Sequence, residues 1–181
     1  MKKDTIVQFV CFVTDLGLDD FLGKWERYAK RLKSDQAEST LLREATTKCK
    51  FRYISQHEWQ GRDFQFSFMN EKRSEHFPEH NVKVIQAGGY TLIHGKQDDT
   101  ENDDTRLLAF VSHDENDIDF YKKAPLQKKV TIYQAYYENC AYGYIVEYQV
   151  SASKAQELAL LLKARPGAEV VGYKECMMTQ A

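Results

Sequence analysis

The first half of the chain alternates between the apolar spacing of strands and that of helices. Residues 6–14 are rich in valine and phenylalanine and predict a buried strand. An amphipathic helix follows, because four large apolar residues recur at spacings of four, three and four: Phe21, Trp25, Tyr28 and Leu32. Residues 40–47 and 50–59 then predict a strand hairpin. Residues 61–69 predict a second helix, and residues 82–93 a closing strand.

The second half of the chain resembles the first. Residues 40–54 match residues 131–145 in one ungapped register, which pairs Cys49 with Cys140. Alternating strands share apolar positions by chance, and this is the alternative explanation. A matched cysteine within an ungapped register favours a tandem duplication instead.

The duplication predicts two halves with one design. A helix at residues 153–164, ended by Pro166-Gly167, indicates that the less regular pattern at 61–69 is a helix too. Each half then has the order strand, helix, strand, strand, helix, strand, which is the ferredoxin-like arrangement and an α+β fold. The expected organisation is an N-terminal half at residues 1–97, an acidic linker at 98–105 and a C-terminal half at 106–181.

Aromatic residues are expected to gather on one face of each half. Side chains alternate between the two faces of a strand, so one face of the strand at 50–59 would carry Phe51, Tyr53, Ser55, His57 and Trp59. The matching face in the second half would carry Tyr142, Tyr144, Val146, Tyr148 and Val150. Exposed aromatic surface of this size is unfavourable in water. We therefore expect two four-stranded sheets to pack face to face and bury both surfaces.

Charge and composition limit the partners that this chain is expected to bind. Twenty-five basic and twenty-seven acidic side chains leave a formal net charge of −2, so no overall attraction to nucleic acid or to an anionic membrane is expected. No apolar stretch approaches the roughly 20 residues that span a bilayer. The four cysteines lack CxxC spacing, which favours free thiols in a reducing compartment. The sequence thus predicts a cytoplasmic protein without a nucleic-acid or membrane partner, and it leaves the oligomeric state open.

Three features of this chain resemble the dimeric α/β-barrel superfamily. They are the element order over nearly the whole chain, the strand that ends in His57-Glu58-Trp59 and the Phe64-to-Met69 helix. Its members include antibiotic-biosynthesis monooxygenases, haem-degrading enzymes and chlorite dismutases. The resemblance implies an intramolecular α/β-barrel pseudo-dimer, with a cleft between sheet and helices where members hold small hydrophobic substrates or haem. Cofactor-free and haem-degrading members use an asparagine on the first strand, with a tryptophan and a histidine further along. This chain departs from them, with Gln8 on its first strand.

A ligand pocket in the first half would be lined by Trp25, His57, Trp59 and Phe68. His57 and Trp59 share a strand face, so an imidazole that can act as acid, base or ligand near neutral pH would stand beside an indole. The alternative is a core histidine that is hydrogen-bonded beside a core tryptophan. Both interpretations agree with the sequence.

Two further histidines, His76 and His80, stand four residues apart with glutamates nearby. On a continuous helix this spacing would direct both imidazoles at one metal ion. Pro78 lies between them and strains such a helix, so an ordinary polar loop is the alternative. His76 joins His57 and Trp59 as a candidate catalytic residue. No metal is assigned, but His76 and His80 are the residues that would bind one.

These observations leave three functions open. The first is a protein with a small hydrophobic ligand pocket between helices and sheet, and the second is a monooxygenase-like or haem-handling enzyme. The third is a structural or interaction protein without a ligand. Fold resemblance alone does not decide between them, because one fold hosts many activities. The sequence assigns no cofactor and does not establish whether the protein is an enzyme.

Overall fold

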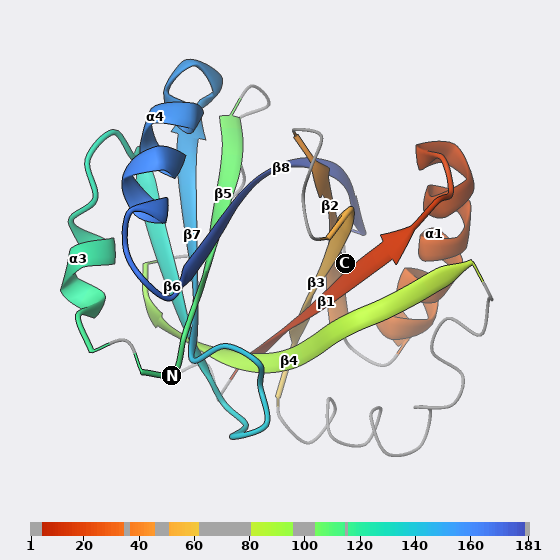
Figure 1. Cartoon of the computed structure of the whole chain (residues 1–181). Coiled ribbons are helices and arrows are strands. Elements are labelled where there is room, and N and C mark those ends of the chain that lie inside the picture. Colours follow the sequence, from red (N-terminus) through yellow and green to blue (C-terminus); the bar gives the residue numbers. More distant parts are fainter. Residues whose placement is uncertain are drawn as a thin grey trace.

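The computed structural model describes residues 5–34, 37–45, 51–61, 81–95, 104–114 and 116–179 (Figure 1). In chain order its elements are β1 (Ile6–Thr14), α1 (Leu18–Ser34), β2 (Ala37–Glu44), β3 (Tyr53–Trp59), β4 (Val82–His94), β5 (Asp104–Val111), α3 (Ile118–Lys122), β6 (Lys129–Ala135), β7 (Tyr144–Ser151), α4 (Ala152–Lys163) and β8 (Ala168–Thr179). This content is the α+β class that the apolar periodicity predicts.

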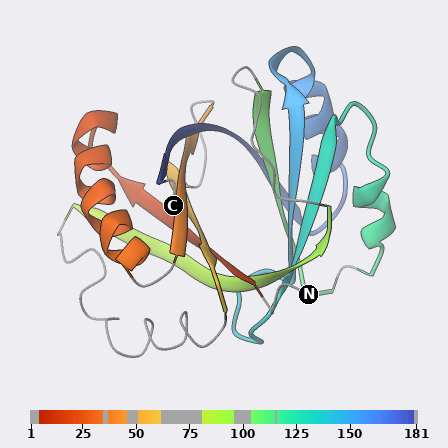
Figure 2. The ribbon, with the colours of Figure 1, turned by 180° about the vertical axis from the view of Figure 1, so that it is seen from behind.

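Eight antiparallel strands close into one barrel, in the order β1-β3-β2-β8-β5-β7-β6-β4 (Figures 1 and 2). Neighbouring strands of the first half therefore follow the order β4-β1-β3-β2, and those of the second half follow the corresponding order β8-β5-β7-β6. Hydrogen-bonded ladders between β2 and β8 and between β4 and β6 join the two groups. The expectation of two separate sheets packed face to face is wrong in this respect. Closure pairs the strand edges that separate sheets would have left open.

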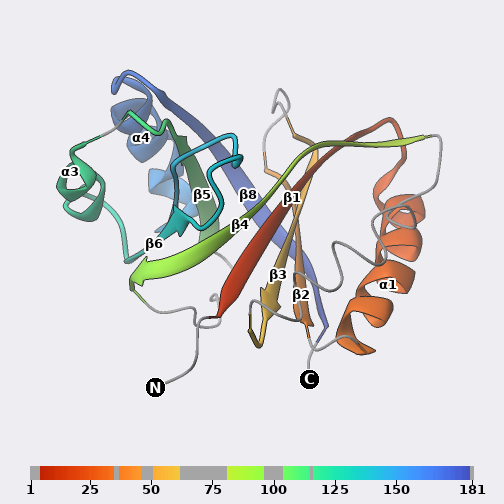
Figure 3. The same ribbon diagram turned by 90° about the horizontal axis from the view of Figure 1, so that it is seen from below.

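The helices lie outside the barrel on opposite sides, α1 against the first group of strands and α3 with α4 against the second (Figure 3). The predicted stripe of α1 is buried: Phe21, Trp25 and Leu32 are fully covered, and Tyr28 is 9% exposed. The stripe packs into an α1 cluster made of Ile6, Val10, Phe12, Phe21, Trp25, Tyr28, Ala29, Leu32, Ala37, Leu41, Tyr53, Trp59 and Val82.

The aromatic face of β3 is directed to α1 and not to the second half of the chain. Tyr53 and Trp59 belong to the α1 cluster, whereas Ile54 faces the barrel interior. The predicted alternation of side chains is correct, but strand periodicity does not specify which layer each face meets. Phe51 lies in the interior because β3 begins only at Tyr53, so the alternation does not extend back to it. On β7, Tyr148 likewise packs toward the helices of the second half.

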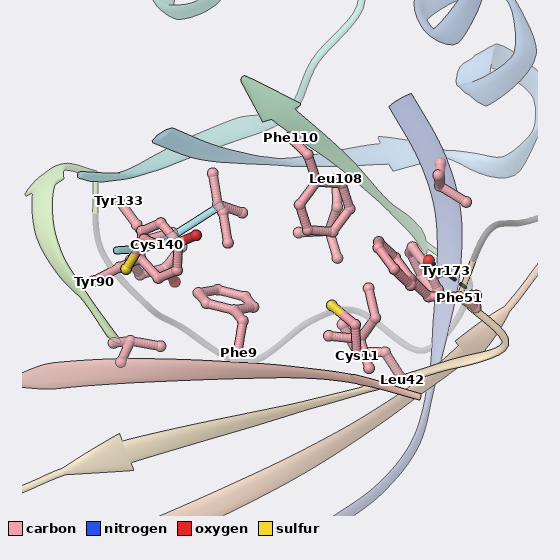
Figure 4. Packing of buried hydrophobic residues seen from close by; sticks show 14 residues of the cluster. Phe9, Cys11, Leu42, Phe51, Tyr90, Leu108, Phe110, Tyr133, Cys140 and Tyr173 are labelled. Atoms are coloured by element: carbon pink, nitrogen blue, oxygen red, sulfur yellow. Dashed lines mark hydrogen bonds between the residues drawn. The ribbon is translucent and has the colours of Figure 1, made fainter. Parts of the chain in front are cut away.

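The barrel interior is lined from both halves by a second apolar cluster, here called the lumen cluster (Figure 4). It contains Val7, Phe9, Cys11, Leu42, Phe51, Ile54, Tyr90, Leu108, Phe110, Tyr133, Cys140, Ile145, Val171 and Tyr173. Buried hydrogen bonds reinforce the contact between the halves, since the Tyr173 hydroxyl donates to the Phe51 carbonyl oxygen at 3.1 Å. The surfaces that the two groups of strands bury against each other are therefore the faces opposite to those expected.

Several predicted boundaries move by a few residues. The strand expected at 40–47 is β2, Ala37–Glu44, and the helix expected at 153–164 is α4, Ala152–Lys163. Strand β5 begins at Asp104, inside the segment predicted as a linker, and Thr105 is buried. The helix predicted at 61–69 falls almost wholly outside the described residues.

None of the helices in the described ranges is long and apolar enough to cross a membrane.

Candidate functional site

A row of polar side chains crosses three strands on the face that α1 covers. Strand pairing places Gln8 of β1 opposite His57 of β3, and His57 opposite Ser39 of β2. All three side chains are buried. The Ser39 hydroxyl lies 2.8 Å from His57 Nδ1, and the Ser55 hydroxyl lies 2.9 Å from His57 Nε2. Both nitrogens of the imidazole are thus held by serine hydroxyls inside an apolar cluster.

The indole of Trp25 extends this row into α1. Its Nε1 donates a hydrogen bond to the Ser55 hydroxyl at 2.7 Å. An indole N–H can only donate, so Ser55 accepts from Trp25 and either donates to or accepts from His57. In one tautomer His57 donates to Ser55 and accepts from Ser39, and in the other both roles reverse. The imidazole can therefore exchange the position of its proton without losing a partner.

Aromatic rings enclose this polar row. Tyr28 of α1 meets the His57 ring edge to face, with the ring centroids 5.6 Å apart. On the other side the Trp59 indole donates to Gln8 Oε1 at 3.2 Å. An amide, an imidazole and an indole thus share one face of the first group of strands.

The structure brings three of the four predicted pocket residues together: Trp25, His57 and Trp59 lie on the same face, each fully buried. The fourth, Phe68, lies outside the described residues. The sequence analysis placed Ser55 on the His57 face, but it did not single out Ser39, Ser55 or Tyr28 as partners of the imidazole. Their signal was the strand period, which puts Ser55 on the His57 face, and the helix period, which puts Tyr28 beside Trp25.

The described residues offer no set of donors suited to a metal ion. His57 has a serine at each nitrogen, and His113 Nε2 lies 2.7 Å from the Cys140 carbonyl oxygen. His94 is exposed on β4. Within the described ranges no group of three or more histidine, cysteine, aspartate or glutamate residues could hold a metal. The predicted pair His76 and His80 lies outside those ranges.

A second polar group lies in the barrel interior. Arg106 of β5 is buried and contacts Glu147 of β7 (Nε to Oε1, 3.4 Å) and Glu175 of β8 (Nη2 to Oε2, 3.1 Å). Its Nη1 donates to Gln56 Oε1 at 3.4 Å, and Gln56 Nε2 donates to the Tyr133 hydroxyl at 3.2 Å. Sequence reasoning missed this group. A signal lay just beyond the matched residues, because continuing the register of residues 40–54 and 131–145 pairs Gln56 with Glu147, a polar residue in each half.

An open groove of about 690 Å³ lies between α3 and the end of α4. It is lined by Asp117, Asp119, Phe120, Lys123, Ala124, Pro125, Leu161, Ala164, Arg165 and Pro166. The Arg165 guanidinium carbon lies 4.7 Å from the centroid of the Phe120 ring, and Arg165 Nη2 lies 3.2 Å from Asp117 Oδ2. The groove is not at the predicted pocket, and its charged groups offer no arrangement typical of catalysis.

Comparisons with solved structures identify the fold. An anthrone oxidase-like protein superposes with a TM-score of 0.65 over 97% of this chain and 93% of its own, at 9% sequence identity. A variant chlorite dismutase from Candidatus Nitrospira defluvii, in complex with cyanide, gives 0.64 over 96% and 91%, at 7% identity. A protein from Lactobacillus acidophilus described as a candidate monooxygenase gives 0.54 over 98% and 96%, at 8% identity.

No protein-family model matches the sequence, and no curated protein sequence matches it. The structural neighbours belong to the dimeric α/β-barrel superfamily, and this chain has their fold. The resemblance drawn from the element order is thereby confirmed. At these sequence identities the likeness shows the fold and leaves the chemistry to the residues of the site.

Proposed function

We propose that this protein binds a small aromatic ligand beside His57, between α1 and the outer face of the first four strands. The observation that carries the proposal is the chain of hydrogen bonds from Trp25 through Ser55 and His57 to Ser39 within an apolar cluster. A core needs no such chain, because apolar residues of the same volume would pack there without polar groups to satisfy. Aromatic walls and a few convergent polar groups are typical of small-molecule sites.

The ligand reaches the imidazole by displacing Tyr28. Among the described groups that contact His57, Tyr28 is the most exposed, at 9%, and its ring contacts the imidazole edge to face. A planar aromatic ligand would take over this ring contact. Its hydroxyl or carbonyl group would then lie within reach of His57.

Binding of 1-naphthol, measured by calorimetry and by thermal unfolding, tests this proposal. We expect 1-naphthol at 100 times its Kd to raise the free energy of unfolding by about 2.7 kcal/mol. Tyr28→Ala should tighten binding because the site is then open, and His57→Leu should weaken it at least about tenfold. His94→Leu, which changes an exposed histidine, is the matched control. Equal affinities for wild type and His57→Leu would contradict the proposal.

A second candidate is an oxidase that acts on this ligand without a cofactor, and the grouping of Gln8, Trp59 and His57 on one face favours it. The resembling enzymes use an amide, a tryptophan and a histidine, and Gln8 supplies the amide with one more methylene than asparagine. In this scheme His57 accepts a proton from a ring carbon, the carbanion forms a bond to O2, and the imidazolium returns the proton to the outer oxygen of the peroxide. The resulting hydroperoxide loses the second hydrogen of that carbon, and its outer oxygen leaves as water.

For anthrone the balance is one anthrone and one O2 giving one anthraquinone and one water. We expect oxygen uptake and anthraquinone absorbance in this ratio, with His57→Gln at least about 100-fold slower, because general base catalysis contributes that much. His94→Gln should keep the wild-type rate. Anthrone that binds without oxygen uptake would exclude the oxidase and leave the binding function.

The repeat in the sequence supports a tandem duplication, with halves at 1–97 and 106–181. Both groups of strands have the same spatial order. Their ladders also keep the register of the ungapped match, because Leu42 pairs with Ile54 in the first half and Tyr133 with Ile145 in the second. Duplication leaves two equivalent outer faces, and among the described residues the polar row of Gln8, His57 and Ser39 lies on the first of them.

A further inference from the structure

A polar group lies in the barrel interior beside the apolar lumen cluster. Gln56, Arg106, Tyr133, Glu147 and Glu175 come from β3, β5, β6, β7 and β8. Side-chain alternation directs them inward, because Tyr133 itself and the residues two positions from the others, Ile54, Leu108, Ile145 and Tyr173, belong to the lumen cluster. The polar group is thus on the opposite face of the sheet from His57.

Arg106 occupies the centre of this group, with one contact each to Gln56, Glu147 and Glu175. Its side chain is 6% exposed, that of Glu147 15% and that of Glu175 29%. Exposure therefore increases toward Glu175. The most solvent-exposed member of the group is therefore on β8.

Two hydrogen-bonding positions in the group have no partner among the described residues. Glu147 Oε2 is buried and accepts no hydrogen bond there. The Tyr133 hydroxyl accepts from Gln56, but none of these residues accepts its proton. Burial and the nearby Glu147 carboxylate raise the pKa of Tyr133 well above its ordinary value, so the phenol stays protonated and remains a donor. A buried polar atom without a partner is unfavourable by about 1–3 kcal/mol.

We propose that the barrel interior contains a subsite for a hydroxyl group, which accepts a hydrogen bond from the Tyr133 phenol and donates one to Glu147 Oε2. Few other groups can do both. An ammonium group cannot accept from Tyr133, and a carboxylate cannot donate to Glu147 and would add negative charge beside two glutamates. A hydroxyl group can accept from Tyr133 and donate to Glu147 without adding a charge.

The ligand that carries this hydroxyl group is a small phenol. The Phe9 and Tyr133 rings meet edge to face with centroids 5.2 Å apart, and the lumen cluster continues from them, so an aromatic ring has apolar contacts next to the polar subsite. An eight-stranded barrel is wide enough either to be filled by side chains or to hold one small ligand. A water molecule can make the same two hydrogen bonds and is the alternative occupant of the subsite.

Comparison of phenol with toluene tests the subsite, because the two differ only in the hydroxyl and methyl groups. We expect calorimetry to show phenol binding at least about tenfold tighter than toluene, although toluene is the more hydrophobic. Tyr133→Phe should lower this preference about fivefold. Tyr148→Phe removes a buried hydroxyl on the opposite face of the same sheet and should leave the preference unchanged. His57→Leu should also leave it unchanged, which separates this subsite from the ligand site under α1.

A crystal structure of the wild-type protein soaked with phenol is a second test of the subsite. We expect the phenol oxygen within hydrogen-bond distance, about 2.6–3.2 Å, of both Tyr133 Oη and Glu147 Oε2. Equal affinities for phenol and toluene would overturn the proposal. So would a structure that keeps an ordered water between the two groups at saturating phenol, because the subsite would then hold a structural water only.

Discussion

Replacing Arg106 with methionine is expected to lower the free energy of unfolding by about 3–5 kcal/mol. The guanidinium is buried between Glu147 and Glu175, and methionine fills a similar volume without charge. Both carboxylates would then remain in the barrel interior with their main cationic partner removed. Urea unfolding monitored by tryptophan fluorescence measures the change.

Arg165→Met is the matched control for this loss. Arg165 also pairs with a carboxylate, but its side chain is 29% exposed and that of Asp117 is 54% exposed. An ion pair in such a position contributes less than about 1 kcal/mol. Combining Arg106→Met with Glu147→Gln should destabilise the protein less than the sum of the two changes, by about 1 kcal/mol or more. If Arg106→Met costs no more than Arg165→Met, the interior ion group does not hold the barrel together.

Replacing His57 with leucine is expected to lower the free energy of unfolding by about 2 kcal/mol or more. Leucine fills most of the imidazole volume, so the loss comes from the hydroxyl groups of Ser39 and Ser55, each of which loses a hydrogen-bond partner inside the α1 cluster. The same unfolding measurement applies.

The Ser39 hydroxyl loses its partner in His57→Leu, and removing this hydroxyl as well distinguishes lost hydrogen bonding from a packing defect. The double variant His57→Leu, Ser39→Ala should recover part of the stability, because replacing both members of a buried polar pair by apolar groups is nearly neutral. A double variant less stable than His57→Leu alone would show that packing, and not hydrogen bonding, dominates at this position.

The elements with the strongest periodicity could be predicted from the sequence. The stripe of Phe21, Trp25, Tyr28 and Leu32 gave α1, and residues 6–14 gave β1 with its observed bounds. The offset of the ungapped match also relates the ladders of the two halves, because Leu42 pairs with Ile54 and Tyr133 with Ile145. These features depend on local spacing, which a sequence contains in full.

The layer that each strand face packs against, and the closure of the strands into a barrel, could not be predicted in the same way. Alternation assigns Tyr53 and Trp59 to one face of β3, but it does not say whether that face meets a helix or another strand layer. The ladders between β2 and β8 and between β4 and β6 join segments far apart in sequence, and no local pattern specifies them. Because the faces were assigned to the wrong layers, the polar group around Arg106 was not expected in the interior.

The candidate site was predicted in part. His57, Trp59 and Trp25 lie together as the strand and helix periods indicate, whereas the serines that hold the imidazole were not singled out. Serine is common on strands and loops alike, so its role becomes visible only when Ser39 is seen opposite His57 on the neighbouring strand. For His76, His80 and Phe68, which lie outside the described residues, the roles remain predictions.

The nitrogen resonances of the His57 imidazole, followed by NMR during a titration with 1-naphthol, test the central claim most directly. If the ligand binds beside His57, the Nδ1 and Nε2 signals of this residue shift in proportion to occupancy, while those of exposed His94 stay unchanged. Binding that saturates by calorimetry while both His57 signals stay in place would contradict the account.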